Sequence, residues 1–207
     1  MTRLWIKICG LRTREAIAAA ASAGADAVGF VFHEPSPRNL SVEAARELQA
    51  AGPAGVDRVA VFLHPSQALV DSVIAAISPD WVQSDAGDFE SLRLPSAQRV
   101  LPVLRGDAPL PVPTPGRCLL ESAHSGMGER GDWGAAARLA PFTQLVLAGG
   151  LDERNVAAAV RSVKPFGVDV SSGVEASRGV KDATRMHEFV RAARAAASPG
   201  QVEESRR

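Results

Sequence analysis

The chain has 207 residues, of which 46% are hydrophobic and 22% are charged. This composition is typical of a globular protein with a sizeable core, and it excludes intrinsic disorder over most of the chain. Because 23 Lys and Arg balance 23 Asp and Glu, the formal net charge is zero. We therefore expect no global electrostatic field that attracts nucleic acid or an anionic membrane. Neither nucleic acid nor a membrane is an expected partner.

The predicted location of the protein is the cytoplasm. The longest apolar stretches, such as residues 16–25, are shorter than the roughly 18–20 residues of a membrane span, and the N-terminus has no signal-peptide pattern. The two cysteines, Cys9 and Cys118, are expected to stay reduced there.

Short apolar runs of β-forming residues alternate along the chain with alanine-rich segments of helical period. Such alternation predicts a parallel sheet, and eight strands favour a closed α/β barrel, the (β/α)8 or TIM-barrel architecture. The predicted strands are residues 4–8, 27–32, 56–62, 81–83, 100–104, 118–120, 145–148 and 167–170. The predicted helices are residues 14–23, 42–51, 67–77, 133–139, 155–163 and 182–197.

The middle and the end of the chain depart from this repeat. Residues 107–116 hold four prolines, which predict a shortened, irregular segment in place of a regular fifth helix. Residues 198–207 are polar and unpatterned, which predicts a disordered tail. Residues 1–197 are therefore expected to form a single barrel domain.

Functional side chains of such barrels lie at the carboxyl ends of the strands and in the loops that follow. Cys9 ends the first strand, where an ionised thiol can act as a base and a neutral thiol can simply pack. Lys7 is expected either to face away from Cys9 or to line the barrel interior. Glu121 ends the sixth strand, where it would form an acid–base pair with Cys9 or lie solvated in a loop. Cys118 starts that strand and is expected to pack.

Glycine-containing turns follow the seventh and eighth strands. Together they predict a phosphate site made of backbone N–H groups, the alternative being two tight turns without a ligand. Asp169, within the apolar eighth strand, needs a partner if it is buried, or it contacts a ligand hydroxyl. The glycines and serine of the predicted phosphate site are Gly149, Gly150, Ser172 and Gly173.

Two loops complete the candidate site. Arg38 lies in a proline-containing loop, where it could pair with a substrate carboxylate through two nitrogens or remain solvated. The glycine-rich residues 125–131 could cover a ligand as a lid. The spacing of the four histidines and the acids predicts no metal site.

Five motifs stand at the predicted strand ends and in the loops, in this chain order: Lys7-Ile-Cys-Gly10, Gly24-Ala-Asp-Ala-Val-Gly-Phe-Val-Phe32, Ser36-Pro-Arg38, Leu147-Ala-Gly-Gly150 and Val168-Asp-Val-Ser-Ser-Gly-Val-Glu175. Together they resemble the phosphoribosylanthranilate isomerases, a family of barrel enzymes of tryptophan biosynthesis. The resemblance covers the chain from residue 4 to about residue 193.

This resemblance implies an Amadori rearrangement of N-(5-phosphoribosyl)anthranilate to 1-(2-carboxyphenylamino)-1-deoxyribulose 5-phosphate, without metal or organic cofactor. Cys9 would be the general base, and Glu121 stands where the family has its acid, an aspartate. Arg38 would hold the anthranilate carboxylate and Asp169 a ribose hydroxyl. The implied phosphate ligands are Gly149, Gly150, Ser172 and Gly173.

Three departures from the family pattern lie in the middle of the chain. Asp85 replaces a histidine, the fifth strand lacks an inward lysine and ends in Arg105, and Glu121 adds a methylene to the acid. These departures leave two alternatives: an enzyme acting on another phosphorylated sugar or aminosugar, and a phosphosugar-binding protein without catalysis. The expected assembly is a monomer or a homodimer.

Overall fold

The structure is a computed structural model that describes residues 3–49, 55–106, 115–121 and 132–198. Eight parallel strands form a closed barrel in which each strand pairs with its neighbour along the chain and β8 pairs with β1. The predicted α/β barrel is therefore confirmed. The strands are β1 (Trp5–Cys9), β2 (Ala27–Val31), β3 (Asp57–Val61), β4 (Trp81–Asp85), β5 (Arg99–Arg105), β6 (Arg117–Glu121), β7 (Gln144–Leu147) and β8 (Gly167–Val170).

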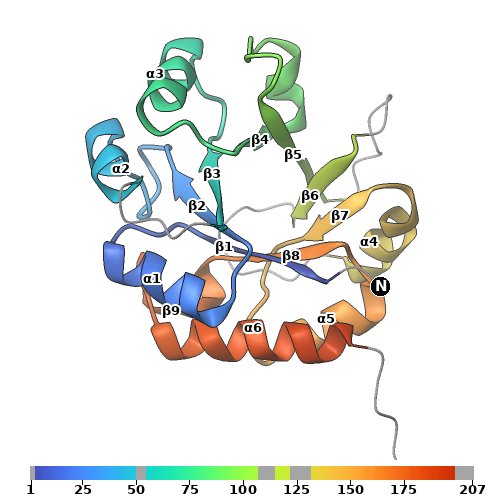
Figure 1. Cartoon of the computed structure of the whole chain (residues 1–207). Coiled ribbons are helices and arrows are strands. Elements are labelled where there is room, and N and C mark those ends of the chain that lie inside the picture. Colours follow the sequence, from blue (N-terminus) through green and yellow to red (C-terminus); the bar gives the residue numbers. More distant parts are fainter. Residues whose placement is uncertain (1–2, 50–54, 107–114, 122–131, 199–207) are drawn as a thin grey trace, which may run out of the picture.

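The helices lie outside the barrel, and α6 runs along its edge beside α1 and α5 (Figure 1). Two of them begin at an oxygen-bearing cap as follows: the Thr13 side chain accepts the N–H of Ala16 at α1, and the Asp182 side chain accepts that of Arg185 at α6. The helices are α1 (Arg14–Ala23), α2 (Val42–Gln49), α3 (Gln67–Ile77), α4 (Trp133–Leu139), α5 (Val156–Val163) and α6 (Ala183–Ala197).

Short elements complete the chain where no full helix was predicted. The connection after β4 is a single 3-10 segment, η1 (Ala86–Glu90), and a second, η2 (Ala140–Phe142), follows α4. After β8 come η3 (Ser172–Val174) and a small antiparallel pair, β9 (Glu175–Ser177) and β10 (Val180–Lys181). Most of the predicted proline-rich segment and of the predicted tail lies outside the described residues, at 107–114 and 199–207.

Two apolar layers hold the barrel together because successive strand residues face opposite sides. Ile6, Ile8 and Phe30 belong to the outer layer between strands and helices. Trp5, Val59 and Leu119 belong to the inner layer that fills the barrel. Since Lys7 and Cys9 follow Trp5 at intervals of two, both side chains face the interior, so the second of the two predictions for Lys7 is confirmed.

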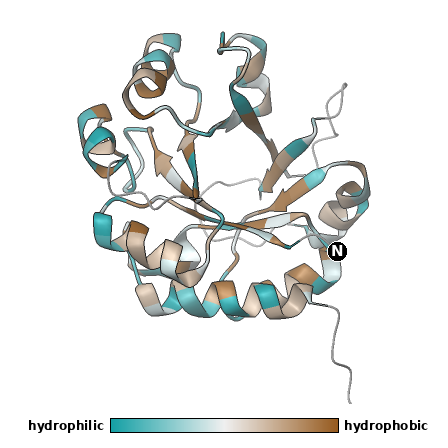
Figure 2. Cartoon of the chain, in the orientation of Figure 1, coloured by the Kyte–Doolittle hydropathy of each residue, from teal (hydrophilic) through white to brown (hydrophobic). Residues whose placement is uncertain are grey.

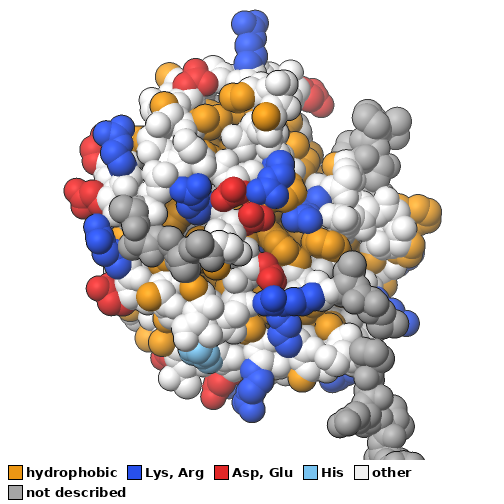
Figure 3. All heavy atoms as spheres, in the orientation of Figure 1, with side chains coloured by type: hydrophobic (Ala, Val, Ile, Leu, Met, Phe, Trp, Pro, Cys, Tyr) orange, Lys and Arg blue, Asp and Glu red, His pale blue; other side chains and the backbone are white. Residues whose placement is uncertain are grey.

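The hydropathy colours agree with this arrangement, since the central strands carry brown segments and the surrounding helices mix brown with teal (Figure 2). On the face shown in Figure 3, acidic and basic side chains are interspersed, as the balanced charge predicts. No helix within the described residues is long and apolar enough to cross a bilayer.

Candidate active site

A cavity of about 270 Å³ opens at the carboxyl ends of the strands. It brings together four of the residues singled out in the sequence, Cys9, Arg38, Glu121 and Asp169, which come from β1, the loop after β2, β6 and β8. Segments more than a hundred residues apart thus supply one site. This is the mouth of the barrel, where enzymes of this architecture carry their chemistry.

Cys9 lies beside a buried ion pair. The side chain of Lys7 is fully buried, and its Nζ donates to Asp169 Oδ1 at 2.8 Å. The partner that buried Asp169 requires is therefore Lys7. Removing either charge alone would leave the other buried and unpaired, which typically costs about 3–5 kcal/mol.

The surroundings of Cys9 act on its ionisation in both directions. Burial raises the pKa of the thiol, the Lys7 ammonium lowers it, the Asp169 carboxylate raises it again and Lys181 lowers it. The net effect is a pKa above the ordinary thiol value. Burial lowers the pKa of Lys7, but Asp169 and Cys9 outweigh burial and raise it, so this lysine stays charged.

Gly29 of β2 makes the room in which these two side chains lie. A Cβ at this position would come within 2.9 Å of Cys9 Sγ and 3.2 Å of Lys7 Cε. Both distances are too short for van der Waals contact, so any larger residue would displace the thiol, the ammonium stem or both.

We therefore expect Gly29→Ala to lower kcat tenfold or more, since a misplacement of about 1 Å can cost roughly 10²-fold. The matched control is Gly116→Ala, because an added Cβ there meets nothing within 4 Å. Steady-state kinetics of both variants, with thermal unfolding to establish that they fold, check the prediction. Equal kcat values for Gly29→Ala and the control would show that the space at Gly29 is not needed to place Cys9 and Lys7.

Arg38 is 7% exposed and is held from one side by Glu175. Its Nε and Nη2 donate to the two carboxylate oxygens of Glu175 at 2.7 and 2.9 Å, and Lys181 Nζ donates to Oε1 at 2.8 Å. Burial raises the pKa of Glu175, but hydrogen bonds from Arg38 and Lys181 outweigh it and lower the pKa to about 2. Glu175 is therefore an anion at neutral pH and fixes the arginine in place.

The two glycine turns meet next to Ser171, which lines the cavity, while the four predicted phosphate ligands are not among the residues that line it. Gly149 and Gly150 have φ values of +87° and +62°, a region that favours glycine. A Cβ on Gly173 would collide with Leu151 O and approach Leu151 C to 2.9 Å, so the loops after β7 and β8 touch through this glycine. Within the described residues, no acceptor pairs with the backbone N–H groups of Gly149, Gly150, Ser172 and Gly173.

Glu121 shares the mouth with Arg105 and Asp85. Arg105 Nη1 donates to Glu121 Oε2 at 3.1 Å, and Arg105 Nη2 donates to Asp85 Oδ1 at 2.6 Å. The acid that the sequence singled out is therefore part of an ion-pair cluster built from β4, β5 and β6. These are the strands on which the sequence departs from the family pattern.

A family model for N-(5'-phosphoribosyl)anthranilate (PRA) isomerase matches residues 6–103 and 112–192. The chain belongs to this family. The resemblance stated from the five sequence motifs is thereby confirmed. A member of the PRA isomerase family from Pelobacter propionicus, the N-(5'-phosphoribosyl)anthranilate isomerase, is 39% identical over 91% of this chain and 95% of its own.

Solved structures of PRA isomerases have the same barrel. TrpF from Jonesia denitrificans is 33% identical, has a TM-score of 0.80 and is matched over 95% of this chain and 100% of its own. A PRA isomerase in complex with reduced 1-(o-carboxyphenylamino)-1-deoxyribulose 5-phosphate is 30% identical, with a TM-score of 0.72, over 92% of this chain and 98% of its own.

Sequence reasoning missed several polar residues of the site. Glu175 was quoted only within a motif, and Lys181 was not considered at all. Gln83 of β4 lines the cavity at 6% exposure, and its Oε1 has no hydrogen-bond partner within the described part of the chain. Gln83 could have been found because it is a polar residue within an apolar strand. Burial of a polar side chain costs free energy unless it has a hydrogen-bond partner.

Two further predictions concern the predicted lid and the second cysteine. Residues 125–131, the predicted lid, lie outside the described residues. Cys118 is fully buried at the opposite end of β6 from Glu121, with its Sγ 3.8 Å from Thr143 Oγ1, and it packs as predicted.

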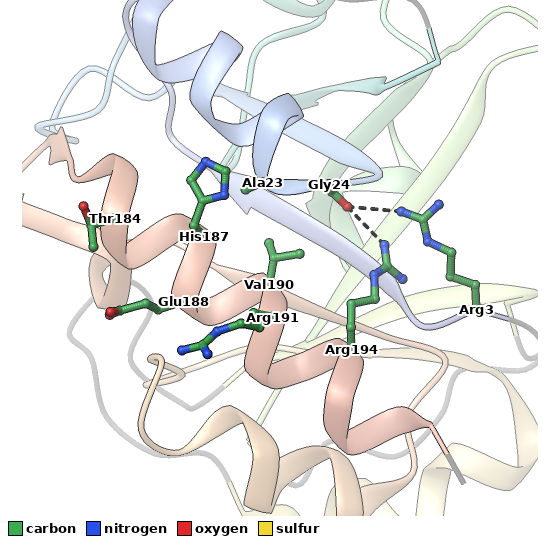
Figure 4. A pocket seen from close by; sticks show the side chains of 9 residues that line it. All are labelled: Arg3, Ala23, Gly24, Thr184, His187, Glu188, Val190, Arg191 and Arg194. Carbon is green, nitrogen blue, oxygen red and sulfur yellow. Dashed lines mark hydrogen bonds between the residues drawn. The ribbon is translucent and has the colours of Figure 1, made fainter. Parts of the chain in front are cut away.

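A second cavity of about 560 Å³ lies on the outside of the barrel between α1 and α6 (Figure 4). Arg3 and Arg194 both donate to Gly24 O, at 3.3 and 3.1 Å, and both pair with Asp26. These arginines fasten α6 and the N-terminal segment to the turn after α1. Their charges already have partners, so we assign this cavity a structural role.

Proposed function

We propose that this protein converts N-(5'-phosphoribosyl)anthranilate into 1-(2-carboxyphenylamino)-1-deoxyribulose 5-phosphate. Membership of the PRA isomerase family supports this reaction. The observation that carries the proposal is the single mouth cavity into which Cys9, the Glu121 carboxyl and Arg38 all face. A thiol and a carboxyl that face one bound sugar are the two groups that general acid–base catalysis of this rearrangement requires.

The proposed chemistry begins with ring opening. The Glu121 carboxyl gives a proton to the furanose ring oxygen, the bond between C1 and that oxygen breaks, and the anthranilate nitrogen supplies the electron pair that forms an iminium at C1. The Cys9 thiolate then removes the C2 proton, and the C2–H electron pair neutralises the iminium to give an enolamine. Finally C1 gains a proton and the C2 hydroxyl loses one, which gives the ketone at C2 and balances the proton that Glu121 gave and the one that Cys9 took. No step in this sequence requires a metal or an organic cofactor.

The remaining residues of the site bind the substrate in this proposal. Arg38 Nη1 takes the anthranilate carboxylate, because Nε and Nη2 are occupied by Glu175. Asp169 accepts a hydrogen bond from a ribose hydroxyl through the oxygen that Lys7 does not use. The proposed ligands of the phosphate are the backbone N–H groups of Gly149, Gly150, Ser172 and Gly173.

The protein is proposed to act in the cytoplasm, as a monomer or a homodimer, on this phosphorylated small molecule. A reducing compartment keeps Cys9 as a free thiol. Nucleic acid and membranes have no part in the proposal.

The decisive experiment follows the loss of substrate fluorescence when purified protein is added to N-(5'-phosphoribosyl)anthranilate. Turnover supports the isomerase. A protein that binds the reduced product analogue without turnover would be a phosphosugar-binding relative, and turnover of another phosphorylated aminosugar alone would indicate a changed substrate.

We expect Arg38→Gln to raise KM at least tenfold, because it removes a charge-assisted contact to the substrate carboxylate. Inorganic phosphate, used as a competitive inhibitor, should bind the variant as tightly as the parent, because Arg38 does not belong to the proposed phosphate site. An unchanged KM would exclude the carboxylate contact. A loss of phosphate binding as well would show that the substitution disturbed the whole mouth.

A further inference from the structure

Arg105 occupies a central place in the mouth. It is the last residue of β5, its register partner on β6 is Glu121, and β4 on the other side ends at Asp85. The side chains of Arg105, Asp85 and Glu121 are 26%, 19% and 17% exposed, so the cluster is mostly shielded from water. An ion pair in such a place is screened less than one on the open surface.

All three nitrogens of the Arg105 guanidinium already donate to carboxylates. Nη1 donates to Glu121, while Nη2 and Nε donate to Asp85, with Nε lying 3.0 and 3.1 Å from its two oxygens. A substrate anion that approached the remaining N–H groups of this arginine would also meet the negative charges of Asp85 and Glu121. The geometry favours a role in holding a neighbour over a role in binding the substrate.

Of the two carboxylates that Arg105 contacts, Glu121 has the longer side chain. A glutamate side chain has three rotatable bonds, and fixing it in one place costs conformational entropy that a specific contact can offset. Arg105, on the neighbouring strand β5, makes such a contact with the Glu121 carboxyl. Asp85 anchors the guanidinium through the opposite edge and so defines where this contact lies.

We propose that Arg105, anchored by Asp85, is a positioning residue that sets the Glu121 carboxyl for proton transfer to the substrate. This inference rests on the proposed function, in which Glu121 is the acid. Arg105 acts through Glu121 and touches no reacting atom.

The test is a double-mutant cycle with wild type, Arg105→Gln, Glu121→Gln and the double variant, each assayed for kcat and KM on N-(5'-phosphoribosyl)anthranilate. We expect Arg105→Gln to lower kcat about 10- to 100-fold with KM changed little. In the Glu121→Gln background, the same substitution should change the residual kcat less than about twofold, since there is no acid left to position. Arg105→Lys, which keeps the charge with one nitrogen, should restore part of the loss.

A matched control separates positioning from simple loss of an ion pair. Arg99 begins the same strand at the opposite end of the barrel and pairs with Asp57 at 3.2 Å. Arg99→Gln should lower the unfolding temperature and leave kcat unchanged.

If the wild type turns over the substrate and Glu121→Gln loses activity, three results would overturn the inference about Arg105. They are an unchanged kcat in Arg105→Gln, an effect confined to KM, and an equal fall of kcat in both backgrounds. If Arg105→Gln does not fold, Asp85→Asn replaces it in the same cycle with the same expected pattern. Absence of turnover in the wild type, or full activity of Glu121→Gln, would instead contradict the proposed function itself.

Discussion

Replacement of Cys9 by serine is expected to lower kcat about 10²- to 10⁴-fold, the range that general acid–base catalysis contributes, with little change in KM. A hydroxyl in the same place keeps the shape of the site, but it does not ionise at neutral pH and cannot take up the C2 proton. Steady-state kinetics measure the effect. Because substrate binding does not depend on the thiol, the reduced product analogue should bind both proteins equally.

The wild-type enzyme should also show a characteristic pH dependence. Burial raises the pKa of Cys9 and, despite opposition from Lys7, the net shift is upward, so the thiol is mostly protonated at neutral pH. The active form of a base is the deprotonated one. We therefore expect kcat/KM to rise as the pH increases from neutral to alkaline, and Cys9→Ser to lack this rise.

The second cysteine provides the matched control. Cys118 is buried like Cys9 but lies at the other end of the barrel. Cys118→Ser should leave kcat and the pH profile unchanged. A similar loss of kcat in both serine variants, or a Cys9→Ser variant that keeps full turnover, would contradict the assignment of Cys9 as base.

The barrel and the strand ends could be predicted because both depend on local pattern. Apolar runs such as Ala27–Val31 and helical periods such as Gln67–Ile77 follow from residue type and spacing alone. The position of Cys9 at a strand end follows equally, since it needs only the length of one strand. The 3-10 segment after β4 was not predicted because Ala86–Glu90 is too short to show a period.

The partners of the charged residues could not be predicted in this way. Lys7 meets Asp169 across 162 positions of the chain, and Arg38 meets Glu175 across 137. Such contacts depend on which strands become neighbours and on the loops that follow them. The alternation of strand residues does fix the face, and because Lys7 lies two residues before Cys9, it places both inside the barrel.

The ion pairs also explain how the mouth can hold so many charges without a metal in the proposed mechanism. Lys7 pairs with Asp169, Arg38 and Lys181 pair with Glu175, and Arg105 pairs with Asp85 and Glu121. Each cation is therefore neutralised by a carboxylate from a different element. The pairs hold the loops in register with the strands, and the Cys9 thiol and the Glu121 carboxyl face the same cavity.

Substitution of Gly173 by alanine is the second change with a large expected effect. The new Cβ would collide with the carbonyl oxygen of Leu151 and lie 3.0 Å from Asp152 Cα, and all of these atoms belong to the backbone. A backbone cannot rotate away as a flexible side chain can, so the loops after β7 and β8 must separate. The proposed phosphate ligands are divided between these two loops, and their separation should raise KM roughly 10- to 100-fold.

The measurement is KM for the substrate together with the inhibition constant of inorganic phosphate, which should rise by a similar factor in Gly173→Ala. Effects on kcat should be smaller, because Cys9 and Glu121 lie on β1 and β6 and do not move with these loops. Gly116→Ala is again the control, since its Cβ meets nothing within 4 Å. If Gly173→Ala folds and binds phosphate as the parent does, the phosphate site does not lie between these loops.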